Sequence, residues 1–192
     1  MKQTAKVAIL AFSIFTGLGG TALAAAPPPA SGPYVSGSVG IGIPGNWDEE
    51  NWGVDKVKTG VPFFGAIGYN YGSTRLELAA GYQKHDWKDT AEDASVTTVM
   101  GNAYYDFDAS SDFRPYVMGG LGIVDVNVSW DTAGSTVFAW QLGTGVGVKV
   151  GNGWTFDLGY RFLKPTGVQC PVDKNDVSWE FHNILAGLRY QF

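Results

Sequence analysis

Apolar and polar residues alternate with a period of two over most of the chain. The alternation is clearest where every second residue is apolar: Trp154, Phe156, Leu158, Tyr160 and Phe162. Because successive side chains of a strand point to opposite faces, this pattern predicts a half-buried β-strand over 154–164. The final residues, 183–192, repeat the pattern and predict a last strand that ends at Phe192.

Six further segments show the same alternation. They are residues 35–43, 63–71, 75–83, 96–107, 114–130 and 137–150. In 114–130 the apolar row consists of Tyr116, Met118, Val124, Val126, Val128 and Trp130. Helical periodicity is not sustained anywhere after the N-terminal region, so the chain is predicted to be all-β with eight strands.

The connections between the predicted strands are of two kinds. Residues 71–74, 108–112 and 151–153 are short, and the first and last of these have the residues that tight turns require. Longer connections span 44–60, 86–94 and 165–177, whereas 131–135 is brief. Short turns that alternate with longer loops are typical of an up-and-down outer-membrane barrel, in which the short turns lie on the periplasmic side.

The first 33 residues do not fit the alternation. Lys2 and Lys6 form a short positive region, which is followed by an apolar stretch and then by a run of small residues. This is the layout of a secretory signal peptide. The apolar stretch is shorter than the about 20 residues that a membrane-spanning helix needs. We therefore predict a cleaved signal peptide over 1–24, a proline-rich extended lead-in over 25–33 and a barrel domain over 34–192.

The composition restricts the possible classes of function. Charged residues make up 16% of the chain, against about 25% in soluble domains. The formal net charge is −5, so the basic surface of a nucleic-acid-binding protein is absent and we expect no nucleic-acid partner. Cys170 is the only cysteine, which excludes an intramolecular disulfide. The two histidines lie in unrelated segments, so no metal site is predicted, and no cofactor motif is present.

The polar face of the strands indicates which face meets the membrane. It combines small residues with a few charges of both signs: Arg75, Glu77, Asp106, Lys149, Asp157, Arg161 and Arg189. The surface of a soluble eight-stranded barrel, such as a lipocalin, would carry more lysine and glutamate. A narrow lumen, in contrast, suits small residues packed among paired charges. We therefore expect a transmembrane barrel with a polar network in its lumen and the apolar rows against lipid.

Aromatic residues recur near the ends of the predicted strands. Tyr116, Trp154, Tyr190 and Phe192 lie near the short turns or the C-terminus. Trp87, Trp130 and Trp179 lie near the opposite ends. Two girdles of aromatic side chains anchor outer-membrane barrels at the two interfaces of the membrane, so this distribution supports the transmembrane interpretation.

Three segments resemble those of a known family. Residues 113–122, 157–162 and the last strand, 182–192, are similar to the small outer-membrane β-barrel family, which includes OmpA- and OmpX-type barrels and opacity-like surface proteins. The resemblance covers essentially the whole chain after the signal peptide. It implies a place in the outer membrane of a Gram-negative bacterium, among its lipids and lipopolysaccharide. It also implies that Leu188, Tyr190 and Phe192 form the C-terminal signature recognised by the barrel-assembly machinery.

These observations favour a surface protein that has no catalytic activity and a structural or adhesive role. Trp47 and Trp52 flank acidic residues in the first long connection and are a candidate contact patch, although they also fit a solvated loop that rests on the barrel rim.

Two other functions stay open. The first is a narrow, porin-like passive channel. The second is a lipid A-modifying enzyme, for which the only suggestive set is Ser178, Glu180 and His182. On one strand these neighbours are about 6.6 Å apart, which is poor geometry for a nucleophile and its base.

Overall fold

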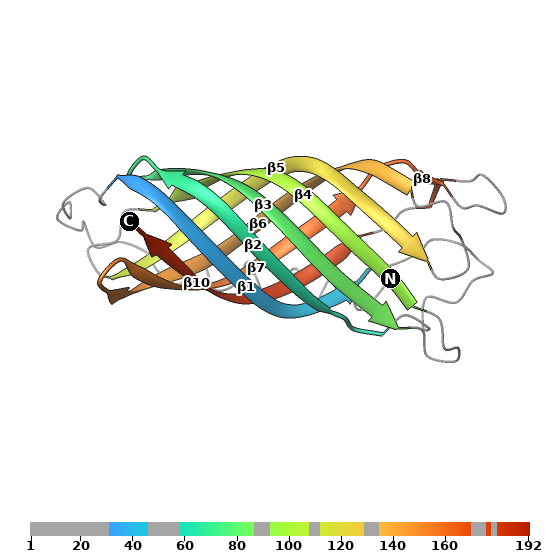
Figure 1. Cartoon of the computed structure of the whole chain (residues 1–192), viewed down its shortest axis with the longest axis horizontal. Helices are drawn as coiled ribbons and strands as arrows, with labels where there is room; N and C mark the ends of the chain where they lie inside the picture. Colours follow the sequence, from blue (N-terminus) through green and yellow to red (C-terminus); the bar gives the residue numbers. More distant parts are fainter. Residues whose placement is uncertain are drawn as a thin grey trace, which may run out of the picture.

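The computed structural model describes residues 31–45, 58–86, 93–107, 112–128, 135–169, 176–177 and 180–192. These residues form a closed antiparallel barrel of eight strands (Figure 1), which confirms the predicted fold. The barrel strands are β1 (Gly32–Pro44), β2 (Val61–Asn70), β3 (Thr74–Asp86), β4 (Asp93–Asp106), β5 (Phe113–Val128), β6 (Ser135–Gly151), β7 (Trp154–Pro165) and β10 (Phe181–Gln191). A separate two-stranded ribbon, β8 (Val168–Gln169) with β9 (Asp176–Val177), lies within the predicted connection 165–177.

Each barrel strand pairs with the strand before and after it in the chain, and β10 closes the barrel against β1. The end of the barrel that carries the short turns is called the turn end here, and the opposite end the loop end. The turn end lies at the left of Figure 1, where β10 finishes. In the β2–β3 turn the amide of Tyr71 donates to the carbonyl of Thr74 at 2.8 Å. Gly72 in this turn has a φ of 109°, a backbone conformation that glycine adopts without steric cost.

The register of the strands fixes the width of the barrel. Starting at Val39, the paired residues on β2, β3, β4 and β5 lead to Thr136 on β6, whereas those on β10 and β7 lead to Val146. These two positions are ten residues apart, so the sheet closes with a stagger of ten residues. Eight strands with this stagger tilt by about 40° and leave an interior just wide enough for side chains.

Side chains alternate between the two faces of the wall, as the sequence predicts for most strands. Large apolar side chains such as Ile41, Leu78, Leu142 and Ile184 point outward and are about half exposed. Their neighbours point inward: on β3 the inward row contains Arg75, Glu77, Ala79 and Gln83, all buried. The outer wall is therefore the apolar one.

On β5 the predicted faces are reversed. Tyr116, Met118, Val124 and Val126 are buried in the interior, whereas Val117, Leu121 and Ile123 are exposed on the outer wall. The alternation was misleading because β5 is apolar on both faces. Pairing with β4 settles the orientation: Met118 lies opposite Tyr104 and Tyr116 opposite Asp106, both of which point inward. Tyr116 is therefore not part of an outer aromatic girdle, and the expectation for it was wrong.

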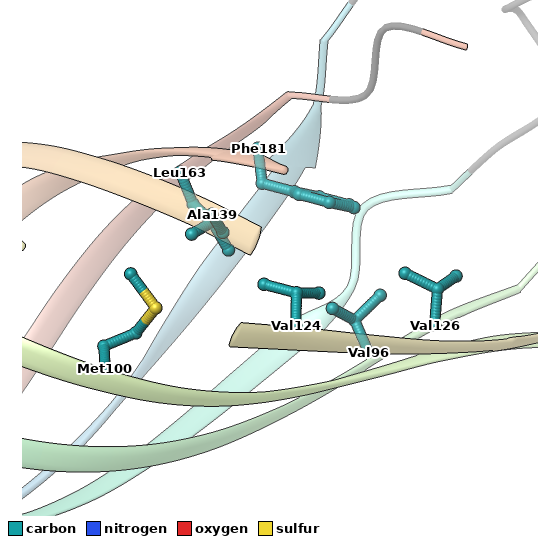
Figure 2. Packing of buried hydrophobic residues seen from close by; sticks show 7 residues of the cluster. All are labelled: Val96, Met100, Val124, Val126, Ala139, Leu163 and Phe181. Carbon is teal, nitrogen blue, oxygen red and sulfur yellow. The ribbon is translucent and has the colours of Figure 1, made fainter. Parts of the chain in front are cut away.

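The loop-end half of the interior contains an apolar cluster that we call the apolar plug, beside the buried polar side chains of Gln83, His85, Thr98 and Asn183. Its members come from β4, β5, β6, β7 and β10: Val96, Met100, Val124, Val126, Ala139, Leu163 and Phe181. Figure 2 shows these side chains converging from facing strands. All are at most 5% exposed, so they pack as the core of a soluble protein does.

Several sequence predictions fall on residues outside the described ranges. They are the signal peptide (1–24), most of the lead-in (25–33), the candidate patch Trp47 and Trp52, Trp87, Trp130, Cys170, Ser178 and Trp179. Within the described ranges, no helix has the length and apolarity that crossing a bilayer demands.

The orientation of β5 can be tested by thiol labelling. In a Cys170→Ser background, Ile123→Cys should react with a lipid-soluble maleimide in the folded barrel, because Ile123 is 51% exposed on the outer wall. Val124→Cys should react only after unfolding, because Val124 is fully buried in the apolar plug. Mass spectrometry after labelling in vesicles measures both. Equal labelling of the two folded variants would contradict this orientation.

Candidate functional site

The interior at the turn end contains a buried ion pair between neighbouring strands. The guanidinium of Arg75 (β3) donates to both carboxylate oxygens of Asp106 (β4), from Nε at 2.7 Å and from Nη2 at 2.8 Å. Both side chains are at most 7% exposed. The Arg75 guanidinium carbon also lies 4.2 Å from the centroid of the Tyr104 ring, which adds a cation–π contact. This bidentate geometry is the strongest form of an arginine–carboxylate pair.

Glu77 is the centre of a hydrogen-bond network in the same half of the interior. Its Oε1 accepts hydrogen bonds from Tyr104 at 2.7 Å and from Asn102 at 3.1 Å, and its Oε2 accepts one from Tyr34 at 3.1 Å. Asn102 in turn accepts a hydrogen bond from Gln141 on β6 at 2.5 Å. The carboxylate of Glu77 is thus stabilised mainly by neutral donors that converge on it from several strands.

A second ion pair joins the last two strands of the barrel. Arg189 (β10) donates to the two oxygens of Asp157 (β7), from Nε at 3.1 Å and from Nη2 at 3.2 Å. The two ion pairs therefore lie on different parts of the wall near the turn end, one between β3 and β4 and the other between β7 and β10. Buried charges of this kind hold a fold only when both partners are present, because removal of one leaves the other charge desolvated.

Arg161 on β7 behaves differently from the other two arginines. Its Nη2 donates to the hydroxyl of Tyr104 at 3.3 Å, and its guanidinium carbon lies 4.8 Å from the centroid of the Phe64 ring. Phe64 belongs to β2, which β1 and β10 separate from β7, so this contact crosses the interior. Among the described residues no carboxylate lies within ion-pair distance of Arg161.

Six of the seven charges that the sequence assigned to the lumen point into the interior: Arg75, Glu77, Asp106, Asp157, Arg161 and Arg189. Lys149 does not join them. It lies at the turn end of β6 with its side chain exposed, so its assignment to the buried network was wrong. The alternation placed it on the inward row, but the strand has left the packed interior at that point.

The sequence did not reveal the neutral members of the network. Tyr34, Tyr104, Asn102 and Gln141 bind to the charges or to each other, and each is at most 5% exposed. Their only sequence signal is that they share the inward row of a strand with small or charged residues. Which of them meet depends on contacts between strands far apart in the chain.

A cavity of about 60 Å³ remains among these groups, lined by Ser36, Ser38, Glu77, Arg161 and Arg189 and their neighbours. It offers room for about four water molecules. Among the described residues no group of three or more His, Cys, Asp or Glu side chains is placed to hold a metal ion.

The outer wall carries a polar cluster near the loop end of β7 and β10. The Tyr160 hydroxyl lies 2.6 Å from Nδ1 of His182, and Nε2 of His182 lies 4.0 Å from Oε1 of Glu180. Lys164 lies 3.7 Å from the other oxygen of Glu180. Phe162 packs against the His182 ring at 5.3 Å. Polar and aromatic side chains of this kind are typical of the level at which a barrel wall meets lipid headgroups.

The three residues of the predicted C-terminal signature lie in one row on the outer wall. Leu188 and Phe192 are exposed, and Tyr190 packs against Trp154 at 4.9 Å and against Phe192 at 5.2 Å between ring centroids. Further outward aromatics at the turn end, Tyr69 with Tyr71 and Tyr105 with Phe107, form similar pairs. Recognition of the row by the assembly machinery stays a prediction.

Comparisons with known proteins agree with this architecture. The family model of the outer membrane protein beta-barrel domain matches residues 10–192. Outer membrane protein PagN of Salmonella typhimurium is 30% identical over 121 residues, with 50% of each chain covered. An uncharacterized protein of Brucella abortus is 28% identical over 137 residues, which cover 52% of this chain and 48% of the relative. The chain therefore spans about half the length of the curated relatives it matches.

Among solved structures, Neisserial surface protein A superposes with a TM-score of 0.64 at 21% identity, over 85% of this chain and 99% of that one. A de novo designed transmembrane β-barrel gives a TM-score of 0.50 at 14% identity, over 86% of this chain and 100% of the design. At these identities the similarity shows the fold alone.

The buried ion pair makes a specific prediction about stability. Arg75→Ala should lower the free energy of unfolding by about 3–5 kcal/mol, because it leaves Asp106 buried without its counter-charge. Lys149→Ala, at the exposed end of β6, should change it by less than about 0.5 kcal/mol. Urea unfolding from lipid vesicles, followed by tryptophan fluorescence, measures both. Equal losses for the two variants would contradict the interior assignment.

Proposed function

Since the chain belongs to the outer membrane protein beta-barrel domain family, we propose that it is a non-enzymatic surface protein that acts through the connections at its loop end. It lies in the outer membrane of a Gram-negative bacterium. With the turn end on the periplasmic side, the loop-end connections reach the cell exterior. There they serve a structural or adhesive role, in contact with a partner outside the cell.

One observation carries this proposal: among the described residues, side chains pack the interior of the barrel and leave only a small cavity. The apolar plug occupies the loop-end half, and the charged network occupies the turn-end half. The cavity of about 60 Å³ between these groups is too small for an organic substrate. The interior therefore supports the wall, and contact with partners falls to the connections.

Trp47 and Trp52 are the residues that we propose for such contact. They lie in the connection between β1 and β2, outside the described residues, and acidic residues stand between them. Exposed tryptophans contribute strongly to protein–protein contacts because their large rings bury much apolar surface.

The polar cluster on the outer wall gives limited support to a lipid A-modifying activity. Ser178, the nucleophile that such an activity would use, lies outside the described residues. The polar neighbours that the structure gives His182 are the hydroxyl of Tyr160 at 2.6 Å and the carboxylate of Glu180 at 4.0 Å. A role in contact with lipid and lipopolysaccharide headgroups fits this mixture of aromatic and charged side chains better.

The adhesive role can be tested in living cells. A non-adherent Gram-negative host that expresses the chain should bind cultured epithelial cells more strongly than the same host with an empty vector. Trp47→Ala combined with Trp52→Ala should remove most of that gain, because the apolar contact surface is lost. The number of bound bacteria per epithelial cell is the measurement.

The matched control for this experiment is Trp154→Phe, which changes an aromatic residue at the turn end and should leave adhesion unaltered. Heat-modifiable gel mobility of the outer-membrane fraction shows that each variant is folded. No gain in adhesion with the native chain, or a full gain with the double variant, would count against the proposed contact role.

The channel alternative makes the opposite prediction for conductance. Because the apolar plug closes the loop-end half of the interior, the purified barrel should show no sustained openings in a planar bilayer. A porin reconstituted in the same way is the positive control. Regular, long-lived openings of the native chain would favour the passive channel over a purely structural barrel.

A further inference from the structure

The outer wall changes from apolar to polar along one line across β3, β4, β5 and β6. Four outward side chains on this line, which we call the boundary row, lie opposite one another on neighbouring strands: Tyr82, Thr97, Asp125 and Thr136. The next outward row toward the turn end is apolar and consists of Ala80, Val99, Ile123 and Phe138. The next outward row toward the loop end is polar and consists of Lys84, Ser95 and Asn127. The lipid-facing surface of these strands therefore ends at the boundary row.

Asp125 holds two polar neighbours in fixed positions on this surface. Its Oδ2 accepts a hydrogen bond from the hydroxyl of Thr136 at 2.9 Å, and its Oδ1 accepts one from the carboxamide of Asn127. A carboxylate has about four acceptor sites, so Asp125 can accept further hydrogen bonds from outside. The carbonyl oxygen of Asn127 and the hydroxyl oxygen of Thr136 add acceptors beside it. The surface around Asp125 is thus rich in hydrogen-bond acceptors.

The acceptors identify the chemical class of a partner. A lipid phosphate presents acceptor atoms and a negative charge, so Asp125 repels it. A sugar presents hydroxyl donors at its edge and apolar C–H groups on its face. The donors match the acceptors around Asp125, and the face matches the ring of Tyr82, which is 47% exposed at one end of the boundary row. With neighbouring strands about 4.8 Å apart, the row spans about 14 Å, which is long enough for more than one sugar ring.

The position of the boundary row identifies the source of the sugar. Its side chains point sideways from the wall, immediately beyond the row of Val99, Ile123 and Phe138, whose side chains are about half exposed toward the lipid tails. The groups that lie beside the wall at this level are the headgroups of the lipids whose tails cover that apolar row. A partner on another cell would instead approach the connections at the loop end.

We propose that the boundary row, together with Asn127, binds the saccharide headgroup of a glycolipid in the outer leaflet of the same membrane. The inference rests on the proposed placement of the loop end outside the cell. The acyl chains of the glycolipid lie against Ile123 and Phe138, its hydroxyl groups donate to Asp125 and Asn127, and one sugar face packs on Tyr82. Such binding holds the barrel at one depth in the leaflet.

Native mass spectrometry of the purified barrel in detergent tests the proposal. The chain is mixed with equal amounts of diglucosyl diacylglycerol and phosphatidylcholine that carry the same acyl chains. EDTA removes the divalent cations that would otherwise bridge lipid and protein. The glycolipid adduct should exceed the phosphatidylcholine adduct about tenfold, because several neutral hydrogen bonds act together. Equal adducts would overturn the proposal, as would an equal or larger excess of phosphatidic acid when it replaces the glycolipid.

Two double variants locate the effect. Thr97→Ala combined with Asp125→Ala should abolish the excess of glycolipid. The matched control is Thr74→Ala combined with Asp112→Ala, which removes a hydroxyl and a carboxylate that are exposed at the turn end, and it should keep the excess. Heat-modifiable gel mobility shows that both variants are folded. A glycolipid excess that survives in the first variant would overturn the proposed site.

Two measurements separate this proposal from the placement on which it rests. In a Cys170→Ser background, Thr59→Cys, at an exposed position of the loop end, should react with a membrane-impermeant maleimide on intact cells. No reaction would overturn the placement, whereas reaction without any glycolipid excess would overturn the saccharide site alone. The free disaccharide, which has no acyl chains, should be retained far more weakly than the glycolipid. Equal retention would overturn the assignment to a membrane lipid.

Discussion

The pairing of β1 with β10 is the constraint on which the rest of the structure depends. A bilayer offers no partner for a free N–H or C=O group, so a sheet inside it must close on itself. Here the closing seam runs without a break from Tyr34 opposite Gln191 to Pro44 opposite Phe181. The amide of Phe192 extends it by a hydrogen bond of 3.1 Å to the carbonyl of Pro33. Eight strands closed with a stagger of ten residues leave one possible width, and that width decides what the interior can contain.

The narrow interior explains why its two halves are packed so differently. In the turn-end half, charges lie close enough to pair across neighbouring strands, as Arg75 does with Asp106 and Arg189 with Asp157. In the loop-end half, the apolar plug gains from close packing and needs no counter-charges. Arg161 and Phe64 meet between these halves. Gly81 makes room for the Phe64 ring, where a Cβ atom would lie 2.3 Å from it.

The strands that are apolar on one face only, such as β3, β7 and β10, could be predicted from the sequence together with their orientation. On β5 both faces are apolar, so the alternation predicts a strand but does not predict which row of side chains points inward. The pairing of β5 with β4 determines that orientation. Individual charges were found because they stand among small residues, but Lys149 shows that an inward position near a strand end need not be buried. The convergence of Tyr34, Asn102 and Tyr104 on Glu77 joins residues up to 43 positions apart, and local pattern holds no information on such contacts.

The same closure separates the stability of this protein from its function. Among the described residues, inward side chains serve packing or pairing and most outward side chains between the aromatic belts face lipid, so substitutions there act mainly on folding. Within the part of the chain that the structure describes, the apolar plug and the network around Glu77 are built by residues of the strands. Loops on a rigid scaffold generally tolerate changes in sequence. A surface protein that must present variable contacts on a constant membrane anchor would need this division.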